Sequence, residues 1–229
     1  MKWVTTNGCE VYQTSGGRSN SYLIFDKGVS FLVDTSIKKS RKTLMGKLNK
    51  FLGEKELSYL ILTHAHYDHF ENVNIIKEKY RPKIVIQSSE GEILRQGNSL
   101  IPKGTNILTR IIAGVGRKLN RLSSYEKIFP DILVDDYYFL SPNCYLIHTP
   151  GHTKGSMSLI VDGEIALVGD AMFGVFSWSI FPPFADDVPT MIQSWEKLLK
   201  TGCKVFLPGH GTSNSRKILK KQLERHGLN

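Results

Sequence analysis

Four side chains that commonly bind metal ions lie within six residues, directly after a short apolar run. The run at 57–62 is typical of a buried strand, and the motif H-x-H-x-D-H follows it as His64, His66, Asp68 and His69. Alternate positions of an extended segment face the same side, so His64 and His66 can address one ion from one strand end. Asp68 and His69 follow as the chain turns and can point at a neighbouring ion. Burying these groups without a partner is costly, and a metal ion supplies that partner.

Three further segments place ligand-type side chains at the ends of predicted strands. His152 lies in T-P-G-H-T-K-G-S, Asp170 ends the apolar run V-G-D, and His210 lies in L-P-G-H-G. Each residue taken singly could be a hydrogen-bonded turn residue. Together with the first motif they make five imidazoles and two carboxylates. Such a donor set suits zinc, and also iron or manganese, and it excludes a thiolate-preferring site because no cysteine takes part.

The apolar pattern predicts one α/β domain over residues 1–229 in which strands come first and helices later in each half. The predicted strands are 22–25, 29–33, 57–62, 83–86, 144–148, 158–161, 164–168 and 205–207. The predicted helices are 44–51, 73–80, 188–200 and a last one that contains 218–223. The turns Asp26-Lys27-Gly28 and Asp162-Gly163 indicate hairpins. Two similar halves of this kind favour two sheets packed face to face with helices outside.

The middle of the chain, about residues 88–143, has the fewest strand signals, and we expect a helical, basic insertion there. Its apolar residues follow helical spacing, although two glycines weaken the pattern; they are Ile107, Leu108, Ile111, Ile112, Val115, Leu119 and Leu122. Six basic residues and one acidic residue, Glu126, lie between Lys103 and Lys127. The stripe is interpreted as packing, with a lid or substrate-binding wall as the alternative.

Composition excludes several classes of protein. A hydrophobic content of 41% and a charged content of 22% are those of a globular domain and exclude a disordered chain or a fibre. The formal net charge of +9 is a weak indication of an anionic substrate, nucleic acid or membrane partner. Cys9, Cys144 and Cys203 are far apart and predict no disulfide framework. No apolar run is long enough for a signal peptide or a transmembrane segment, so a cytoplasmic location is expected.

The series of ligand-type residues resembles that of the metallo-β-lactamase-fold hydrolases, from V-D-T at 33–35 to P-G-H-G at 208–211. The resemblance implies an αββα sandwich of two mixed β-sheets with helices on the outer faces. It implies that His64, His66 and His152 hold one ion. It also implies that Asp68, His69 and His210 hold a second ion, that Asp170 bridges the two, and that Asp34 orients the ligands.

The resemblance also implies a dinuclear metal-dependent hydrolase. Its cofactors would be two divalent metal ions, with zinc expected and iron or manganese as alternatives. Two such ions can share a hydroxide that is formed near neutral pH and attacks the substrate. Asp68 is the predicted catalytic residue, since it could orient this hydroxide and later carry a proton to the leaving group.

The departures from particular subfamilies narrow the expected substrate. Typical β-lactamases of this fold usually do not carry an aspartate at the position of Asp170. Flavodiiron-type proteins carry a glutamate at the position of His66. The chain ends 19 residues after His210, so the helical extension of glyoxalase II is not expected. We therefore expect cleavage of a carboxylic ester, thioester or lactone. A phosphodiesterase acting on a nucleotide or another anionic substrate, and a metal-binding module with little activity, are the alternatives.

The segment 172–187 is rich in aromatic residues and follows Asp170 directly. We interpret it as an apolar wall for an acyl substrate, with core packing or a subunit interface as equal alternatives. The expected partner is a small molecule, acyl or anionic. Nucleic acid is possible but not favoured as a partner, and a homodimer is possible.

Overall fold

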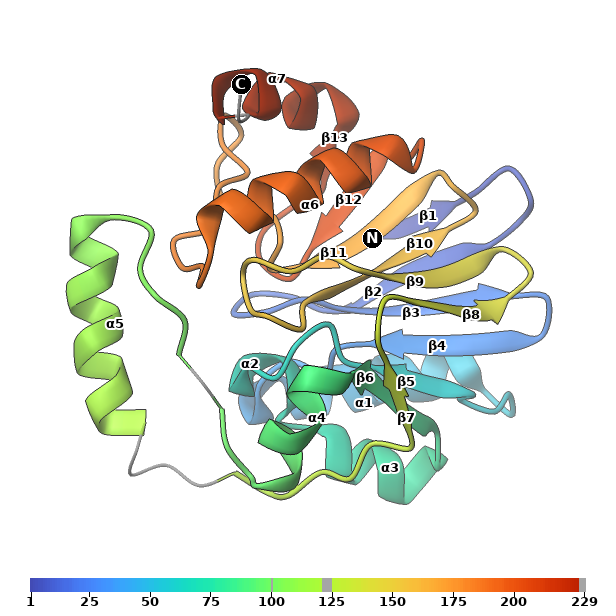
Figure 1. The fold of residues 1–229 in the computed structure, drawn as a ribbon. Coiled ribbons are helices and arrows are strands. Elements are labelled where there is room, and N and C mark those ends of the chain that lie inside the picture. The colour runs from blue at the N-terminus through green and yellow to red at the C-terminus, as the bar shows by residue number, and fades with distance from the viewer. Residues whose placement is uncertain (100, 121–124, 227–229) are drawn as a thin grey trace.

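The protein folds into two mixed β-sheets that pack face to face (Figure 1). The structure is a computed structural model and describes residues 1–99, 101–120 and 125–226. The first sheet runs in chain order through β1 (Lys2–Val4), β2 (Glu10–Ser15), β3 (Ser21–Asp26), β4 (Val29–Val33), β5 (Tyr59–Ile61), β6 (Lys83–Gln87) and β7 (Ile132–Val134). Strands β1 to β4 are antiparallel, and β4 to β7 are parallel.

The second sheet is formed by the later part of the chain. Its order is β13 (Asn214–Ser215), β12 (Val205–Pro208), β11 (Ile165–Gly169), β10 (Met157–Val161), β9 (Cys144–His148) and β8 (Tyr137–Ser141). Strands β8 to β11 are antiparallel neighbours, whereas β11 and β12 are parallel. This sheet is therefore also mixed, as expected.

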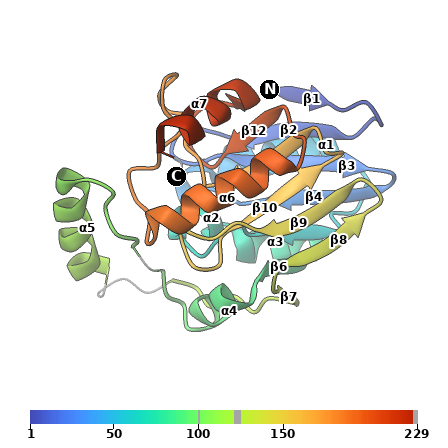
Figure 2. The ribbon, with the colours of Figure 1, turned by 45° about the horizontal axis from the view of Figure 1, so that its top comes forward.

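Helices cover both outer faces of the sandwich, as Figure 2 shows from a second angle. Beside the first sheet lie η1 (Lys38–Ser40), α1 (Arg41–Leu52), α2 (Tyr67–Phe70), α3 (Val73–Tyr80) and α4 (Ser88–Arg95). Helices α6 (Val188–Lys200) and α7 (Arg216–His226) cover the second sheet, and α5 (Ile107–Asn120) stands apart from both. The predicted αββα sandwich is confirmed.

The side chains of each strand point alternately to the two faces of its sheet, and this explains why both faces are covered. Phe31 and Val33 of β4 lie in the core between the sheets, whereas Leu32 packs with the helix side chains Leu44 and Leu48 of α1. Successive side chains of a strand point to opposite faces, so a strand that is buried on both faces has to be apolar throughout. Each sheet thus shares one apolar core with its partner sheet and has a second one beneath its own helices.

The expectation for residues 88–143 was wrong in its last third. The segment contains α4 and α5, but it ends in β7 and β8, for which we predicted no strands. Strand β8 is an edge strand, and Tyr137 and Phe139 are exposed on it, so its apolar residues do not alternate with polar ones. Leu122 of the predicted helical stripe lies outside the described residues. The two predicted hairpin turns are confirmed, with positive φ at Lys27, Gly28 and at the 162–163 turn.

Five strands point their carboxyl ends at one edge of the sandwich. Strands β4 and β5 are parallel neighbours in the first sheet, while β9, β11 and β12 share one direction in the second. The residues that follow these five strands include every ligand-type residue predicted from the sequence. The topology therefore gathers predicted ligands that are up to 146 positions apart, namely His64 and His210, at one place.

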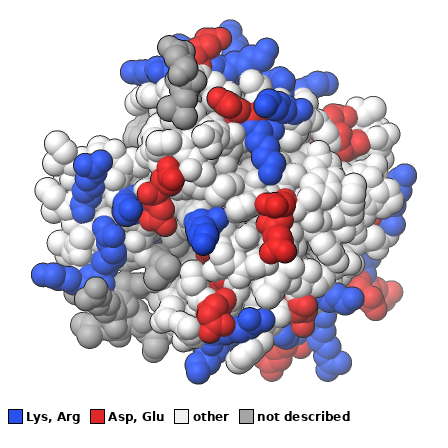
Figure 3. Space-filling model, viewed as in Figure 1, with Lys and Arg blue, Asp and Glu red and all other residues white. Residues whose placement is uncertain are grey.

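The charge of the molecule is unevenly spread. In Figure 3, Lys and Arg side chains gather over α5, at the left of the view, and again near α7. Among the described residues, no helix has the length and apolar character needed to cross a membrane.

Candidate metal centre

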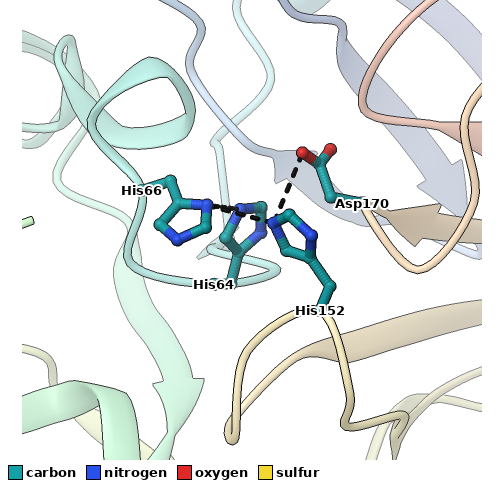
Figure 4. A group of neighbouring side chains, drawn as sticks. All are labelled: His64, His66, His152 and Asp170. Atoms are coloured by element: carbon teal, nitrogen blue, oxygen red, sulfur yellow. Dashed lines mark hydrogen bonds and ion pairs between the residues drawn. The ribbon is translucent and has the colours of Figure 1, made fainter. Parts of the chain in front are cut away.

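The structure brings all seven predicted ligand residues together at this edge. They form two groups, and within each group the ligand atoms lie within 4.8 Å of one another. The first group contains His64, His66, His152 and Asp170 (Figure 4). The second group contains Asp68, His69 and His210.

Three imidazoles of the first group point their nitrogens at a common centre. His66 Nδ1 lies 2.9 Å from His64 Nε2 and 3.1 Å from His152 Nε2. Ligand nitrogens about 2.0–2.1 Å from a tetrahedral zinc ion would lie about 3.3–3.4 Å apart. The three nitrogens therefore need to separate by only a few tenths of an ångström to hold such an ion.

Asp170 connects the two groups. Its Oδ2 lies 3.5 Å from His152 Nε2 and 3.2 Å from His210 Nε2, while its Oδ1 lies 3.5 Å from His69 Nε2. Asp68 closes the second group, with Oδ2 3.5 Å from His210 Nε2. One carboxylate thus faces imidazoles of both groups.

Several buried polar atoms in the cluster have no hydrogen-bond partner among the described residues. They include His69 Nε2 and Asp170 Oδ1, which both face into the second group, and His66 Nε2. Leaving a buried polar atom unpaired costs about 1–3 kcal/mol, more if it is charged. A divalent cation would satisfy His69 Nε2 and Asp170 Oδ1, so the residues present fit a metal ion.

The outer nitrogens of four histidines are anchored, which leaves the inner nitrogens free as donors of lone pairs. Nδ1 of His152 donates to the Phe184 carbonyl at 2.8 Å, and Nδ1 of His210 donates to the Arg18 carbonyl. These tautomers follow from the hydrogen-bond network. Metal-binding histidines almost always donate their second N–H to a carbonyl or carboxylate in this way, which fixes the orientation of the ring.

The remaining two anchored histidines share Asp34. Nδ1 of His69 donates to Asp34 Oδ2 at 2.8 Å. His64 Nδ1 donates to Thr63 Oγ1 at 3.0 Å, and that hydroxyl donates to Asp34 Oδ2 at 2.8 Å. Asp34 is 2% exposed, and its Oδ1 accepts the backbone N–H of Thr63. It therefore orients one histidine of each group, as the resemblance implied.

We expect the substitution Asp34→Asn to weaken metal binding by about 10- to 100-fold, because one amide cannot accept all three hydrogen bonds. The stoichiometry of bound metal at saturation should be unchanged. Competition with a chromophoric chelator measures the affinity, and Asp131→Asn, at an exposed carboxylate far from the cluster, is the control. Wild-type affinity in the Asp34 variant would show that Asp34 does not orient the ligands.

The protonation states suit metal binding in the first group. Burial lowers the pKa of His64, His66 and His152, so these imidazoles are neutral at pH 7. In His69, burial also disfavours the charge, but Asp170 and other nearby carboxylates outweigh it and raise the pKa to about 10. The pKa of Asp170 lies well below its usual range, because contact with imidazoles outweighs its burial. A metal ion in the second group would therefore displace the proton of His69.

The sequence analysis did not identify Glu90, whose carboxylate accepts hydrogen bonds from the two loops that carry the histidines of the first group. This carboxylate is 3% exposed; its Oε2 accepts the N–H of Ala65 at 2.8 Å and its Oε1 accepts the N–H of Gly155 at 3.1 Å. It thus joins the loop of His64 and His66 to the loop of His152. A glutamate in a region without a motif gives no sequence signal for this role.

Gly209 lets the sheets approach closely at the cluster. A Cβ atom at this position would lie 2.3 Å from Asp170 Oδ1 and 2.7 Å from His69 Cε1. Any other residue would push the Asp170 carboxylate out of place. The glycine before His210 is thus required by the ligands around it as well as by the turn.

A cavity of about 310 Å³ opens beside the cluster. Asp68, Asp170 and three of the histidines line its floor, and Arg18 and Tyr67 line one wall, where the guanidinium donates to the phenol oxygen at 2.7 Å. The other walls are mainly apolar, with Ile101, Pro102, Ile112, Ala113, Phe173, Pro183 and Phe184. Such a mixture of an apolar wall and a few polar groups is typical of a small-molecule site.

The aromatic segment 172–187 divides its side chains between three environments. Phe173 stacks on His210 with ring centroids 4.6 Å apart and lines the cavity together with Phe184. Ile180 is buried in the core beneath α6. Phe176 and Trp178 point to solvent and are not part of the cavity. The two ends of the segment therefore line the cavity, whereas the middle of the segment does not.

Comparison with known proteins agrees with this architecture. A family model described as the metallo-beta-lactamase superfamily matches residues 14–210. The chain is 28% identical to a probable metallo-hydrolase of Methanocaldococcus jannaschii, over 88% of this chain and 91% of that protein. It is 25% identical to a probable metallo-hydrolase of Bacillus subtilis, over 84% of this chain and 79% of that protein.

Solved structures share the fold. An archaeal metallo-beta-lactamase superfamily protein from Sulfolobus tokodaii superposes with a TM-score of 0.68 at 20% identity, covering 98% of this chain and 90% of that one. A protein crystallised in a di-iron-bound form superposes with a TM-score of 0.67 at 19% identity, covering 92% and 98%.

Proposed function

The chain belongs to the metallo-β-lactamase superfamily, and we propose that it is a dinuclear metal-dependent hydrolase that cleaves a carboxylic ester, thioester or lactone. The observation that carries this proposal is the position of the seven-residue cluster beside a largely apolar cavity, which five of its members line. The names of its curated relatives as probable metallo-hydrolases support the reaction class.

We propose two divalent ions, one for each group of ligands. His64, His66 and His152 would hold the first ion, Asp68, His69 and His210 the second, and Asp170 would contact both. Zinc suits these nitrogen and oxygen donors, with iron or manganese as alternatives, and the di-iron form of a structural neighbour supports a dinuclear site. When bound, such ions lower the pKa of water towards about 7 and stabilise negative charge on a carbonyl oxygen.

Asp68 is the proposed catalytic residue. It lines the cavity, and its side chain is 13% exposed, whereas His64 is fully buried. Its carboxylate can therefore accept a proton from water in the cavity, orient that water, and deliver the proton to the leaving group. Its position at the start of α2 fixes the carboxylate relative to His69 on the same turn.

The cavity walls favour an acyl substrate with one polar end. Ile101, Ile112 and Phe184 offer apolar surface to an acyl chain. Arg18 and Tyr67 offer a cation and a phenol to a carbonyl, carboxylate or other polar end. The reacting ester would lie between them, over Asp170.

A phosphodiester is the second candidate substrate, and it is favoured by the same Arg18 and by the net charge of +9. Guanidinium groups bind phosphate oxygens well. The apolar walls would then face the leaving group or a base.

The proposal is tested by assaying metal-loaded protein on a p-nitrophenyl acyl ester and an acyl lactone beside bis-p-nitrophenyl phosphate. We expect turnover of the ester or lactone to exceed that of the phosphodiester by about tenfold or more in kcat/KM, with chelator-treated protein as the control. Dominant phosphodiester cleavage would support the second candidate. Lack of turnover on all three by fully loaded protein would favour a metal-binding module.

We also propose that the protein works in a reducing compartment, the cytoplasm. All three cysteines, Cys9, Cys144 and Cys203, are free and buried. Proteins of oxidising compartments more commonly pair their cysteines as disulfides.

A further inference from the structure

Helix α5 exposes an apolar stripe to solvent. Ile107 is 78% exposed, Leu108 68%, Ile111 62% and Val115 57%. These positions follow the i, i+4, i+8 spacing of one helix face, with Leu108 beside them. A monomeric protein rarely leaves so continuous an apolar surface in water, so the stripe indicates an interaction surface.

The opposite face of α5 belongs to the cavity. Ala113 is 1% exposed and lines the cavity with Ile112 and Gly116. In Figures 1 and 2 the helix stands at one end of the molecule, apart from the two sheets. One helix therefore forms a wall of the substrate cavity on its inner face and an unpaired apolar surface on its outer face.

The segment that carries this stripe is basic, although Asp186 and Asp187 line a shared pocket with Lys103, Arg110 and Arg117. The segment 103–118 contains Lys103, Arg110, Arg117 and Lys118 and no acidic residue. Figure 3 shows Lys and Arg side chains gathered at the end of the molecule where α5 lies. An apolar stripe flanked by Lys and Arg is the pattern of helices that lie in the interface of an anionic membrane.

A second exposed apolar edge comes from the loop on the other side of the cavity. Val175 is 56% exposed, Phe176 52% and Trp178 68%, and the last two rings lie with centroids 5.1 Å apart. The same loop contacts the segment just before α5, since Thr105 N donates to the Pro183 carbonyl at 3.0 Å. Aromatic side chains, tryptophan above all, are favoured at membrane–water interfaces.

We propose that α5 and the 175–178 edge dock the protein on the surface of a membrane that contains anionic lipids. The three cations of α5 and Lys103 just before it supply attraction to acidic headgroups, and the two apolar edges enter the boundary of the acyl chains. A symmetric contact between two copies of α5 would bring the same cations together, so charge disfavours a second copy as the occupant. The anionic face of a bacterial or eukaryotic cytoplasmic leaflet offers the complementary charge.

The docking surface narrows the substrate class, a step that rests on the proposed hydrolase function. Both apolar edges belong to segments that also line the cavity, α5 through Ile112 and the 172–187 segment through Phe184, so docking would bring the cavity close to the membrane surface. The substrate expected there is an ester, thioester or lactone with a long acyl chain that partitions into lipid. Arg18 at the opposite wall would bind its polar end.

Sedimentation with vesicles tests the docking surface without any use of hydrolysis. The full chain is mixed with vesicles of phosphatidylcholine alone, or of phosphatidylcholine and phosphatidylglycerol in equal parts. We expect binding at least about tenfold stronger to the anionic vesicles, and a marked loss of binding at high salt. Equal binding to both vesicles, or none to either, would overturn the proposal even if the protein proves to be a hydrolase.

Variants locate the surface. The double variant I111S/V115S and the double variant R117E/K118E are each expected to lower the partition coefficient about tenfold or more. Phe139→Ser is the matched control, because Phe139 is also 68% exposed but lies on β8, at the other end of the molecule. Circular dichroism confirms that each variant is folded. Loss of binding in the control alone would overturn the assignment.

Sedimentation velocity tests whether a second copy of the chain, and not a membrane, covers α5. We expect a monomer in the absence of vesicles. A dimer that is lost in I111S/V115S would show that a second copy covers α5 and would overturn the membrane proposal.

Discussion

The substitution Asp170→Ala is expected to abolish hydrolysis, lowering kcat/KM by about 10⁴-fold or more. Its two oxygens face His69, His152 and His210 at 3.2–3.5 Å, whereas Asp68, the other carboxylate of the cluster, belongs to the second group. Removing it leaves neighbouring imidazoles without the negative charge that would hold two cations close together. The measurement is kcat/KM on the best ester, together with metal content per chain.

The control for this prediction is Asp136→Ala. That carboxylate is 85% exposed and lies outside the cluster, so activity and metal content should match the wild type. Activity retained within tenfold in Asp170→Ala, with bound metal unchanged, would show that the bridging role is wrong.

The substitution Asp68→Asn is expected to lower kcat by about 10²–10⁴-fold, because an amide cannot carry the proton that the leaving group needs. The loss should depend on the leaving group. An alkyl ester expels a strongly basic alkoxide and needs the proton, whereas a p-nitrophenyl ester expels a stable anion. We therefore expect a loss about tenfold or more larger for the alkyl ester, in protein saturated with metal.

Glu71→Gln is the matched control, since Glu71 follows α2 directly and contacts the backbone of Lys38 rather than the cluster. An equal loss on both esters would contradict proton transfer by Asp68 and leave it a role in holding metal or positioning water. Unchanged kcat on both would exclude Asp68 from catalysis.

The ligand cluster could be predicted from the sequence because its signals are local. Each ligand follows an apolar strand within a few residues, and Gly or Pro beside His152 and His210 marks the turn. Strands that run in one direction end at one edge, so the strand ends had to meet. The helix at 188–200 was also predicted within its observed bounds, since Pro189 and the apolar spacing define it.

The remaining features depend on partners far away in sequence. Glu90 acts through backbone groups of two other loops, which no pattern around position 90 reveals. Strand β8 shows no alternation of apolar and polar residues in the sequence, because its outward-facing residues are aromatic. It is recognised only by its pairing with β9. The outward direction of the α5 stripe could not be predicted either, since the same spacing is typical of a helix packed on a core.

The central claim, a dinuclear metal-dependent hydrolase, is tested most directly by measuring metal per chain and hydrolysis on the same samples. Protein is stripped with a chelator, assayed, reloaded stepwise with zinc, iron or manganese, and analysed by mass spectrometry of its metals. The account predicts no hydrolysis in stripped protein, and activity that rises with loading to a maximum at about two ions per chain. Full hydrolysis by metal-free protein, or a cluster that binds no ion at saturating metal, would contradict it.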